Sequence, residues 1–172
     1  MWAYDNRPGV AAQAPPRWPS DSALRASTTT PTLVFVAHPQ CSCTRASLDE
    51  LAEILARAKS RPKTYVLFLK PSAGDASWDN TDLWRQAAQI KGVIALRDDE
   101  GAEARRFGVE TSGQTMLYDT HGALVFSGGV TGSRGHAGDN DGEETLVALL
   151  SGRDSQRRTS NVFGCPIFAT AD

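Results

Sequence analysis

The stretch from residue 32 to residue 59 constrains the fold most, because an apolar run, two cysteines and an amphipathic segment follow one another directly. Thr32–Ala37 supplies apolar residues to both faces, as is typical of a buried central strand. Cys41 and Cys43 follow, and apolar residues then recur at helical spacing from Cys43 to Lys59. The pattern predicts a strand, a cysteine turn and a helix, whose first amides favour thiolate over thiol.

The remaining elements alternate between strand and helix. Strands are predicted at 63–69, 93–96, 115–118 and 123–126, and helices at about 80–90, 102–107 and 143–150. Asp79 or Asn80 is the predicted cap of the second helix, and Asp141 that of the last. Long crossovers imply parallel pairing at the start, whereas the tight turn Asp119–Gly122 implies an antiparallel pair. We therefore predict an α/β three-layer sandwich with a mixed central sheet.

Length and charge narrow the class of protein. The chain has 172 residues, enough for one domain with a substantial core. Its net charge of −2 and the absence of a nucleic-acid-binding motif argue against a nucleic-acid partner. No apolar stretch is long enough to span a bilayer. Three cysteines allow one disulfide with a free thiol, or a site of three thiolates.

Three segments are expected. Residues 1–31 form a Pro- and Ala-rich leader and linker without a signal-peptide pattern. It is either a loosely docked leader or the remainder after a preceding membrane anchor or signal has been removed, since its Trp and Tyr residues suit a membrane interface. Residues 32–150 form the α/β domain. Residues 151–172 form a tail that docks on this domain through Phe163 and Phe168.

The thiols admit two chemistries, dithiol redox and binding of a soft metal. Cys41 and Cys43 cooperate only if Cys41 lies in the turn before the helix, because residues two apart on a helix point to different faces. Cys165 is either a buried structural thiol, a resolving thiol or a third ligand. His38 either lowers a thiol pKa, binds metal or bonds the backbone. His136, in the glycine-rich segment 128–142, is either a metal ligand or a surface residue.

The order of elements, with cysteines between the first strand and helix, resembles the thioredoxin-like superfamily. The segments 98–109 and 116–122 are similar to motifs of its secreted members. Four further motifs resemble a RedB-like, TlpA-like extracytoplasmic branch: His38-Pro39-x-Cys41-x-Cys43, Ser127-Gly128-Gly129-Val130, Gly135-His136-x-Gly138-Asp139-Asn140 and Phe163-Gly164-Cys165-Pro166. The resemblance implies a periplasmic or otherwise extracytoplasmic protein that acts on protein thiols or disulfides.

Two departures from the superfamily pattern matter. Aligned by its first helix, the chain places Cys41 at the position of the nucleophilic cysteine and Thr44 at that of the resolving cysteine, with Cys43 one position early. Ser112-Gly113-Gln114 stands where many members have a cis-proline. That proline is thought to discourage metal capture and to help hold substrate peptides, so its absence makes metal binding easier to entertain.

Our first hypothesis is a thiol–disulfide oxidoreductase without a cofactor. Cys41 exchanges with the substrate, and Cys43 or else Cys165 resolves the mixed disulfide. The alternative is a metal-binding or copper-delivery protein with Cys41, Cys43 and His136 or Cys165 around Cu(I).

Overall fold

A single five-stranded sheet organises the protein in the computed structural model, which describes residues 6–74, 77–78 and 80–168. The strands are β1 (Thr32–Ala37), β2 (Lys63–Lys70), β3 (Val93–Asp99), β4 (Gln114–Tyr118) and β5 (Leu124–Gly128). The helices are α2 (Cys43–Arg57), α3 (Asp82–Gln89), α4 (Ala102–Arg106) and α5 (Asp141–Leu150). None of the helices in the described part of the chain is long and apolar enough to cross a membrane.

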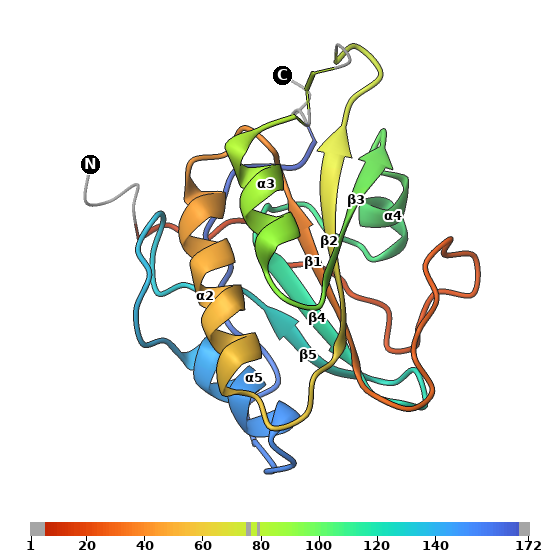
Figure 1. Cartoon of the computed structure of the whole chain (residues 1–172), viewed down its shortest axis with the longest axis vertical. Helices are drawn as coiled ribbons and strands as arrows, with labels where there is room; N and C mark the ends of the chain where they lie inside the picture. The colour runs from red at the N-terminus through yellow and green to blue at the C-terminus, as the bar shows by residue number, and fades with distance from the viewer. Residues whose placement is uncertain (1–5, 75–76, 79, 169–172) are drawn as a thin grey trace.

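The strands lie in the order β3-β2-β1-β4-β5, with β3 and β5 at the edges (Figure 1). β1 pairs in parallel with β2, and β2 with β3, because α2 and α3 carry the chain back across the sheet. β4 runs antiparallel to both β1 and β5. Every residue of β1 is buried, as its apolar sequence predicts. The predicted α/β fold with a mixed central sheet is confirmed.

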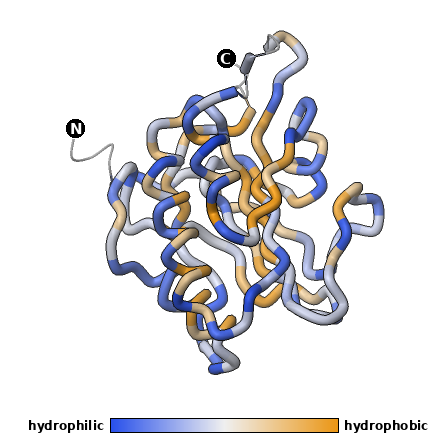
Figure 2. The backbone as a smooth tube through the Cα atoms, viewed as in Figure 1, coloured by the Kyte–Doolittle hydropathy of each residue, from blue (hydrophilic) through white to orange (hydrophobic). Residues whose placement is uncertain are grey.

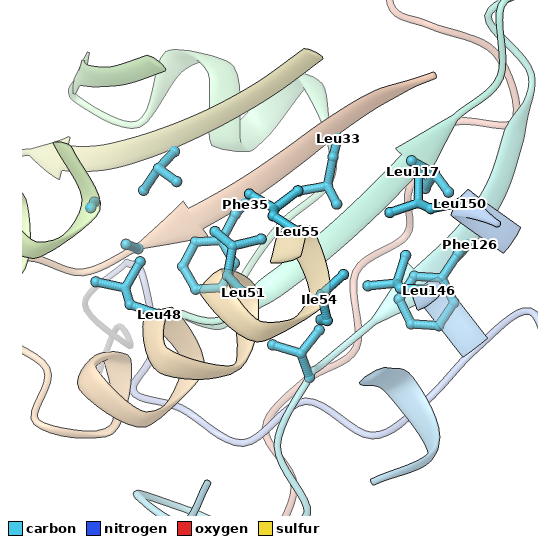
Figure 3. Packing of buried hydrophobic residues seen from close by; sticks show 14 of the residues in the cluster. Leu33, Phe35, Leu48, Leu51, Ile54, Leu55, Leu117, Phe126, Leu146 and Leu150 are labelled. Carbon is cyan, nitrogen blue, oxygen red and sulfur yellow. The ribbon is translucent and has the colours of Figure 1, made fainter. Parts of the chain in front are cut away.

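One face of the sheet is covered by α2, α3 and α5 (Figure 1). Alternate residues of each strand point to this face, since the side-chain period of a strand is two. They interlock with the apolar stripe of α2 and the inner face of α5 (Figure 3). The buried residues include Leu33, Phe35, Leu48, Leu51, Ile54, Leu117, Phe126, Leu146 and Leu150.

The opposite face is covered by α4 and by the two ends of the described chain. Figure 2 shows that hydrophobic residues gather in the strands, whereas many hydrophilic residues lie on the surrounding helices and loops. We name residues 6–31 the N-terminal arm and residues 151–168 the C-terminal tail. This second core contains Val34, Val36, Leu67, Phe107, Met116, Tyr118 and, from the tail, Ile167; Ala12, Ala14, Trp18 and Phe168 pack against it.

The N-terminal arm is bonded to the body along its length. The Gln13 amide donates to the Gly108 carbonyl at 3.1 Å, and the Trp18 amide to the Gly122 carbonyl at 2.8 Å. The Trp18 ring meets the Phe107 ring edge-on, with 5.1 Å between centroids. The described part of the leader is therefore packed on the second core rather than loosely docked.

The end of β3 and the caps of two helices differ from prediction for physical reasons. β3 continues to Asp99, because the buried Asp98 carboxylate accepts the amides of Glu103 and Ala104 and so fixes the start of α4. Thr81 caps α3 through its side chain, in place of Asn80; the other predicted cap, Asp79, lies outside the described residues.

The cap of α5 also differs from prediction. The Asn140 side chain accepts the amides of Gly142 and Glu143, and Asp141 is the first helical residue instead of the cap.

Candidate functional site

Cys41 lies in the turn between β1 and α2, before the helix begins. Its amide donates to the His38 carbonyl at 3.1 Å, and its own carbonyl accepts the Thr44 amide at 3.0 Å. Ser42 is the N-cap position and makes no side-chain cap bond, and Cys43 is the first helical residue. Cys41 is therefore outside the helix, the arrangement that lets its thiol meet a neighbour across the turn. Only 2 % of Cys41 is exposed.

The C-terminal tail brings Cys165 to Cys41. The two Sγ atoms lie 2.7 Å apart, closer than two sulfur atoms in ordinary van der Waals contact, although 124 positions separate the residues in sequence. Both are free thiols. Figure 1 shows the end of the tail beside the start of α2. Two thiols in contact form a disulfide, with about 2.05 Å between sulfurs, through a small displacement.

Backbone pairing holds the tail in this position. The Ser112 amide donates to the Cys165 carbonyl at 2.8 Å, and the Ile167 amide donates to the Glu110 carbonyl at 2.7 Å. Between these bonds Thr111 faces Pro166 as an antiparallel pair. The tail therefore runs as a short extended segment paired with the segment that leads into β4. This pairing fixes the position of Cys165 relative to Cys41.

Cys43 and Arg134 complete the site. Cys43 is half-buried and lies close enough to the Cys41 sulfur and to the Arg134 guanidinium for both to act on its pKa. Arg134, from the glycine-rich segment, also donates to the Gly164 carbonyl next to Cys165. One cation thus connects the tail, the second cysteine of the turn and the loop after β5.

A hydroxyl pair lies beneath the cysteine turn. The Thr44 and Ser112 hydroxyls are 2.9 Å apart, and the His38 amide donates to the Ser112 hydroxyl at 2.9 Å. The next residue, Gly113, has a φ of 89°, and its amide donates to the Val36 carbonyl at 2.8 Å. No cis peptide bond occurs in the described segments, so the turn before β4 is a trans turn that uses glycine.

Cys41 is the most acidic of the three thiols. Burial alone would raise the pKa of Cys41. Hydrogen bonds from the Cys165 thiol, from the backbone of Cys165 and Cys43 and from Thr44 outweigh the effect of burial, so the pKa of Cys41 is lowered. The direction is the one expected from the sequence. The causes differ, because the Cys165 thiol contributes more than the first helical amide.

The other two thiols are held neutral. Burial raises the pKa of Cys165 to about 12, and its hydrogen bond to Cys41 and the negative charge there act in the same direction. Burial and the Cys41 charge also raise the pKa of Cys43, partly offset by Arg134. The site therefore favours one thiolate, on Cys41, flanked by two thiols that donate to it.

The two histidines lie apart from this chemistry. His38 is half-buried, and its Nδ1 accepts the Gln40 amide at 3.2 Å; burial lowers its pKa and favours the neutral ring. His136 is exposed, with Nδ1 2.7 Å from the Arg134 carbonyl oxygen. Among the described residues no three His, Cys, Asp or Glu side chains are grouped so that they could hold a metal ion, and His136 is not brought to Cys41 and Cys43.

Sequence reasoning missed Arg134 and the partnership of Thr44 with Ser112. Arg134 belongs to a segment singled out for its glycines and for His136, and one arginine there carries no signal. In the sequence, Thr44 and Ser112 stand out only as departures from a family pattern. Their contact joins the start of a helix to the turn before β4, which no local pattern reports.

Comparisons with known proteins agree on the fold. No family model matches the sequence, and no curated protein matches it either. An uncharacterized conserved protein of Geobacillus kaustophilus is similar in structure, with a TM-score of 0.63 and 15% identity over 98% of this chain and 96% of the other. A hypothetical protein of Sinorhizobium meliloti 1021 is also similar in structure, with a TM-score of 0.58 and 21% identity over 96% of each chain.

A third structure carries a descriptive name. The exposed lipoprotein thioredoxin Etrx1 of Streptococcus pneumoniae has a TM-score of 0.52 and 20% identity, over 73% of this chain and 86% of that one. The first two structures cover nearly the whole chain, whereas this thioredoxin covers about three quarters of it. The fold of this chain is thioredoxin-like.

Proposed function

We propose that this protein is a thiol–disulfide oxidoreductase whose redox couple is Cys41 and Cys165. The observation that carries the proposal is the 2.7 Å contact between their sulfur atoms, made by a tail that is itself paired to the body. The contrast in acidity supports it, since an attacking thiol needs thiolate character and Cys41 is the thiol with a lowered pKa.

The reaction proceeds in two exchanges. The Cys41 thiolate attacks one sulfur of a substrate disulfide, the substrate S–S bond breaks, and the other substrate sulfur leaves as a thiolate that takes a proton from water. Cys165, deprotonated at this stage, then attacks the Cys41 sulfur. The Cys41–Cys165 bond forms, and the second substrate sulfur leaves and is protonated. Two protein thiols are oxidised and one substrate disulfide is reduced.

Arg134 and Cys43 support the second exchange. Cys165 has to lose its proton before it attacks, and the nearby guanidinium of Arg134 acts in that direction on its pKa. Cys43 sits between Arg134 and Cys41 and, in this proposal, donates to the Cys41 sulfur without entering the couple. The role of resolving cysteine, left open between Cys43 and Cys165 by the sequence, goes to Cys165.

The setting we propose is extracytoplasmic, in the RedB-like, TlpA-like branch, with protein thiols or disulfides as substrates. The motifs around Cys41 and Cys165 support this branch. A thioredoxin-like fold shared with an exposed lipoprotein thioredoxin supports the compartment, since stable dithiol–disulfide couples belong to oxidising surroundings.

Three serine variants test the couple, with reduction of insulin disulfides as the readout. Cys41→Ser is expected to abolish activity. Cys165→Ser is expected to accumulate a mixed disulfide on Cys41, detectable by mass spectrometry under non-reducing conditions. Cys43→Ser is the matched control and is expected to turn over without accumulating it. If Cys43→Ser traps the substrate and Cys165→Ser turns over, the couple is Cys41–Cys43; if Cys41→Ser remains active, the proposal fails.

A further inference from the structure

The glycine-rich segment that carries Arg134 is fastened to α2, the helix that begins with Cys43. The Gly138 amide donates to the Glu50 carboxylate at 2.6 Å, and Glu50 belongs to α2. We propose that Glu50 is a positioning residue, because this bond holds the segment where Arg134 reaches both Cys43 and the tail. The inference rests on the proposed function and adds a residue that controls the second exchange.

The segment needs fastening because its middle leaves the body of the protein. Residues 128–131 are buried, whereas residues 135–139 are exposed. His136 bonds to carbonyls of the segment itself, so these bonds shape the loop without tying it to the body. Ordering an exposed loop costs conformational entropy, and contacts with the body have to offset that cost. The bond from Gly138 is such a contact, four residues after Arg134 in the chain.

The acceptor at Glu50 is suited to hold a backbone amide. Glu50 is 5 % exposed, so water competes little for its oxygen. A hydrogen bond to a carboxylate is also stronger than one between neutral groups. Gly138 meets it with a φ of 134°, which glycine adopts readily and other residues do not. A buried acid on α2 and a glycine 88 positions later therefore form one specific contact.

Two further charged residues act on this buried region. Glu143 of α5 is 2 % exposed and forms an ion pair with Arg57 of α2. Burial raises the pKa of Glu143, and the charges of Glu50 and Asp139 act in the same direction, against Arg57. Glu143 therefore takes up a proton above the ordinary range of a glutamate, which removes a negative charge near Glu50. The carboxylate that accepts the Gly138 amide is thus balanced by Arg57 and by a neighbouring acid that is readily neutralised.

Through Arg134 this contact acts on the resolving thiol. Burial raises the pKa of Cys165, and the nearby guanidinium of Arg134 lowers it. In the second exchange Cys165 loses its proton to water and attacks the Cys41 sulfur; the Cys41–Cys165 bond forms, the bond to the substrate breaks, and the substrate sulfur leaves. A displaced Arg134 therefore slows this exchange. Glu50 itself lies two helical turns into α2, about 10 Å from its start, so its own charge acts weakly on the thiols.

The two exchanges are separable with dithionitrobenzoate, supplied at less than one equivalent to the reduced full chain. The first release of thionitrobenzoate reports attack by Cys41, and the second reports attack by Cys165 on the resulting mixed disulfide. Glu50→Ala is expected to leave the first release unchanged and to slow the second about tenfold, the effect of a rise of about one unit in the pKa of Cys165. Glu50→Gln keeps an acceptor oxygen and should restore most of the rate. Glu53→Ala, at an exposed position of α2, is the matched control.

Gly138→Ala tests the same contact from the exposed side, without removing a buried side chain. A Cβ there meets no atom within 4 Å, but the φ of 134° disfavours alanine. The amide is therefore expected to leave Glu50, and the second release should slow as it does in Glu50→Ala. Gly132→Ala is the control, because a Cβ there meets no atom closer than 3.9 Å and its φ is not positive. An unchanged second release in both Gly138→Ala and Glu50→Ala would overturn the proposal.

A double variant shows whether Glu50 acts through Arg134. Arg134→Gln removes the guanidinium and is expected to slow the second release by itself. Adding Glu50→Ala should then slow it no further, because the two substitutions remove one effect. An equal slowing in both backgrounds would overturn the positioning role. If Cys165→Ser abolishes the second release but Glu50→Ala leaves it unchanged, only the positioning role fails; if neither release depends on Cys41 in the folded protein, the oxidoreductase proposal itself fails.

Discussion

The Thr44 hydroxyl is hydrogen-bonded to the Ser112 hydroxyl, with 2.9 Å between the oxygens. By alignment of the first helix, these residues occupy the places of the resolving cysteine and of the residues at the cis-proline in the thioredoxin-like pattern. The two departures from that pattern are therefore one local arrangement. A hydroxyl pair fills the space under Cys41, and in the proposed couple the resolving thiol comes from the tail instead of from position 44.

The Thr44–Ser112 pair is expected to behave as a coupled unit. Thr44→Val should reduce the free energy of unfolding by about 1–3 kcal/mol, because it leaves a buried hydroxyl without its partner. In a cycle with Ser112→Ala the two losses should fall short of additive by about 1 kcal/mol. Urea unfolding of the reduced protein measures both. Thr145→Val, which removes a remote hydroxyl bonded to the Asp141 carbonyl, should be additive with Ser112→Ala.

The rate of thiol–disulfide exchange is expected to depend on the lowered pKa of Cys41. Exchange requires the thiolate, so the rate falls only when the pH drops through that lowered pKa, and it persists below the range of an ordinary thiol. Cys165→Ala removes the hydrogen bond that lowers the pKa of Cys41 most, while burial still raises that pKa. The inflection of the curve of rate against pH should therefore move to higher pH. Thiolate absorbance against pH measures it. Cys43→Ala keeps the backbone amide that acts on Cys41 and should move the inflection less than Cys165→Ala does. An unmoved inflection in Cys165→Ala would contradict this account.

Oxidation is expected to stabilise the fold. A Cys41–Cys165 disulfide joins positions 124 residues apart, so the chain-entropy estimate for the closed loop is about 5 kcal/mol, an upper value. That corresponds to a rise in Tm of at most roughly 10–20 °C for a chain of this size. Calorimetry of oxidised and reduced protein measures the difference. Cys43→Ser should keep the difference in Tm between oxidised and reduced protein, and Cys165→Ser should lose it. The reverse result would assign the disulfide to Cys41 and Cys43.

The N-terminal arm is expected to contribute to stability through Trp18. Its ring meets the rings of both Phe107 and Tyr118, at 5.1 and 5.2 Å between centroids. Trp18→Ala should lower the free energy of unfolding by about 2–4 kcal/mol, since the side chain is half-buried. Val10→Ala is the control, because Val10 is 59% exposed and its loss should change stability by less than about 0.5 kcal/mol. Equal effects would mean that the arm is not held by this ring.

Elements with a continuous apolar signal were predictable from sequence. β1 has the predicted bounds, Thr32–Ala37, because every one of its residues is buried and the run ends where polar residues begin. β3 was predicted too short, because its last residues are polar. Asp98 is buried because its carboxylate accepts amides from the first turn of α4. A hydropathy pattern does not reveal such hydrogen bonds.

Only the part of the site that is local in sequence, the turn with Cys41 and Cys43, was predictable. The turn with Cys41 and Cys43 follows from a strand leading into a helix, and the structure places both thiols there. The position of Cys165 depends on two backbone bonds between the tail and Glu110–Ser112. Backbone bonds leave no signature in side-chain chemistry, so the sequence left Cys165 open between a structural thiol, a resolving thiol and a third ligand.

The position of β3 at the edge of the sheet has a consequence for self-association. β5, the other edge strand, is partly covered, since the Ser127 amide donates to the Arg158 carbonyl at 3.0 Å. Within the described residues no further strand pairs with the outer side of β3, and Ile94 is 40% exposed on it. An exposed ion pair between Arg97 and Asp99 lies along the same strand. Charged side chains on an open edge oppose strand-to-strand stacking between molecules, so this pair protects the protein from aggregation where its backbone is most open.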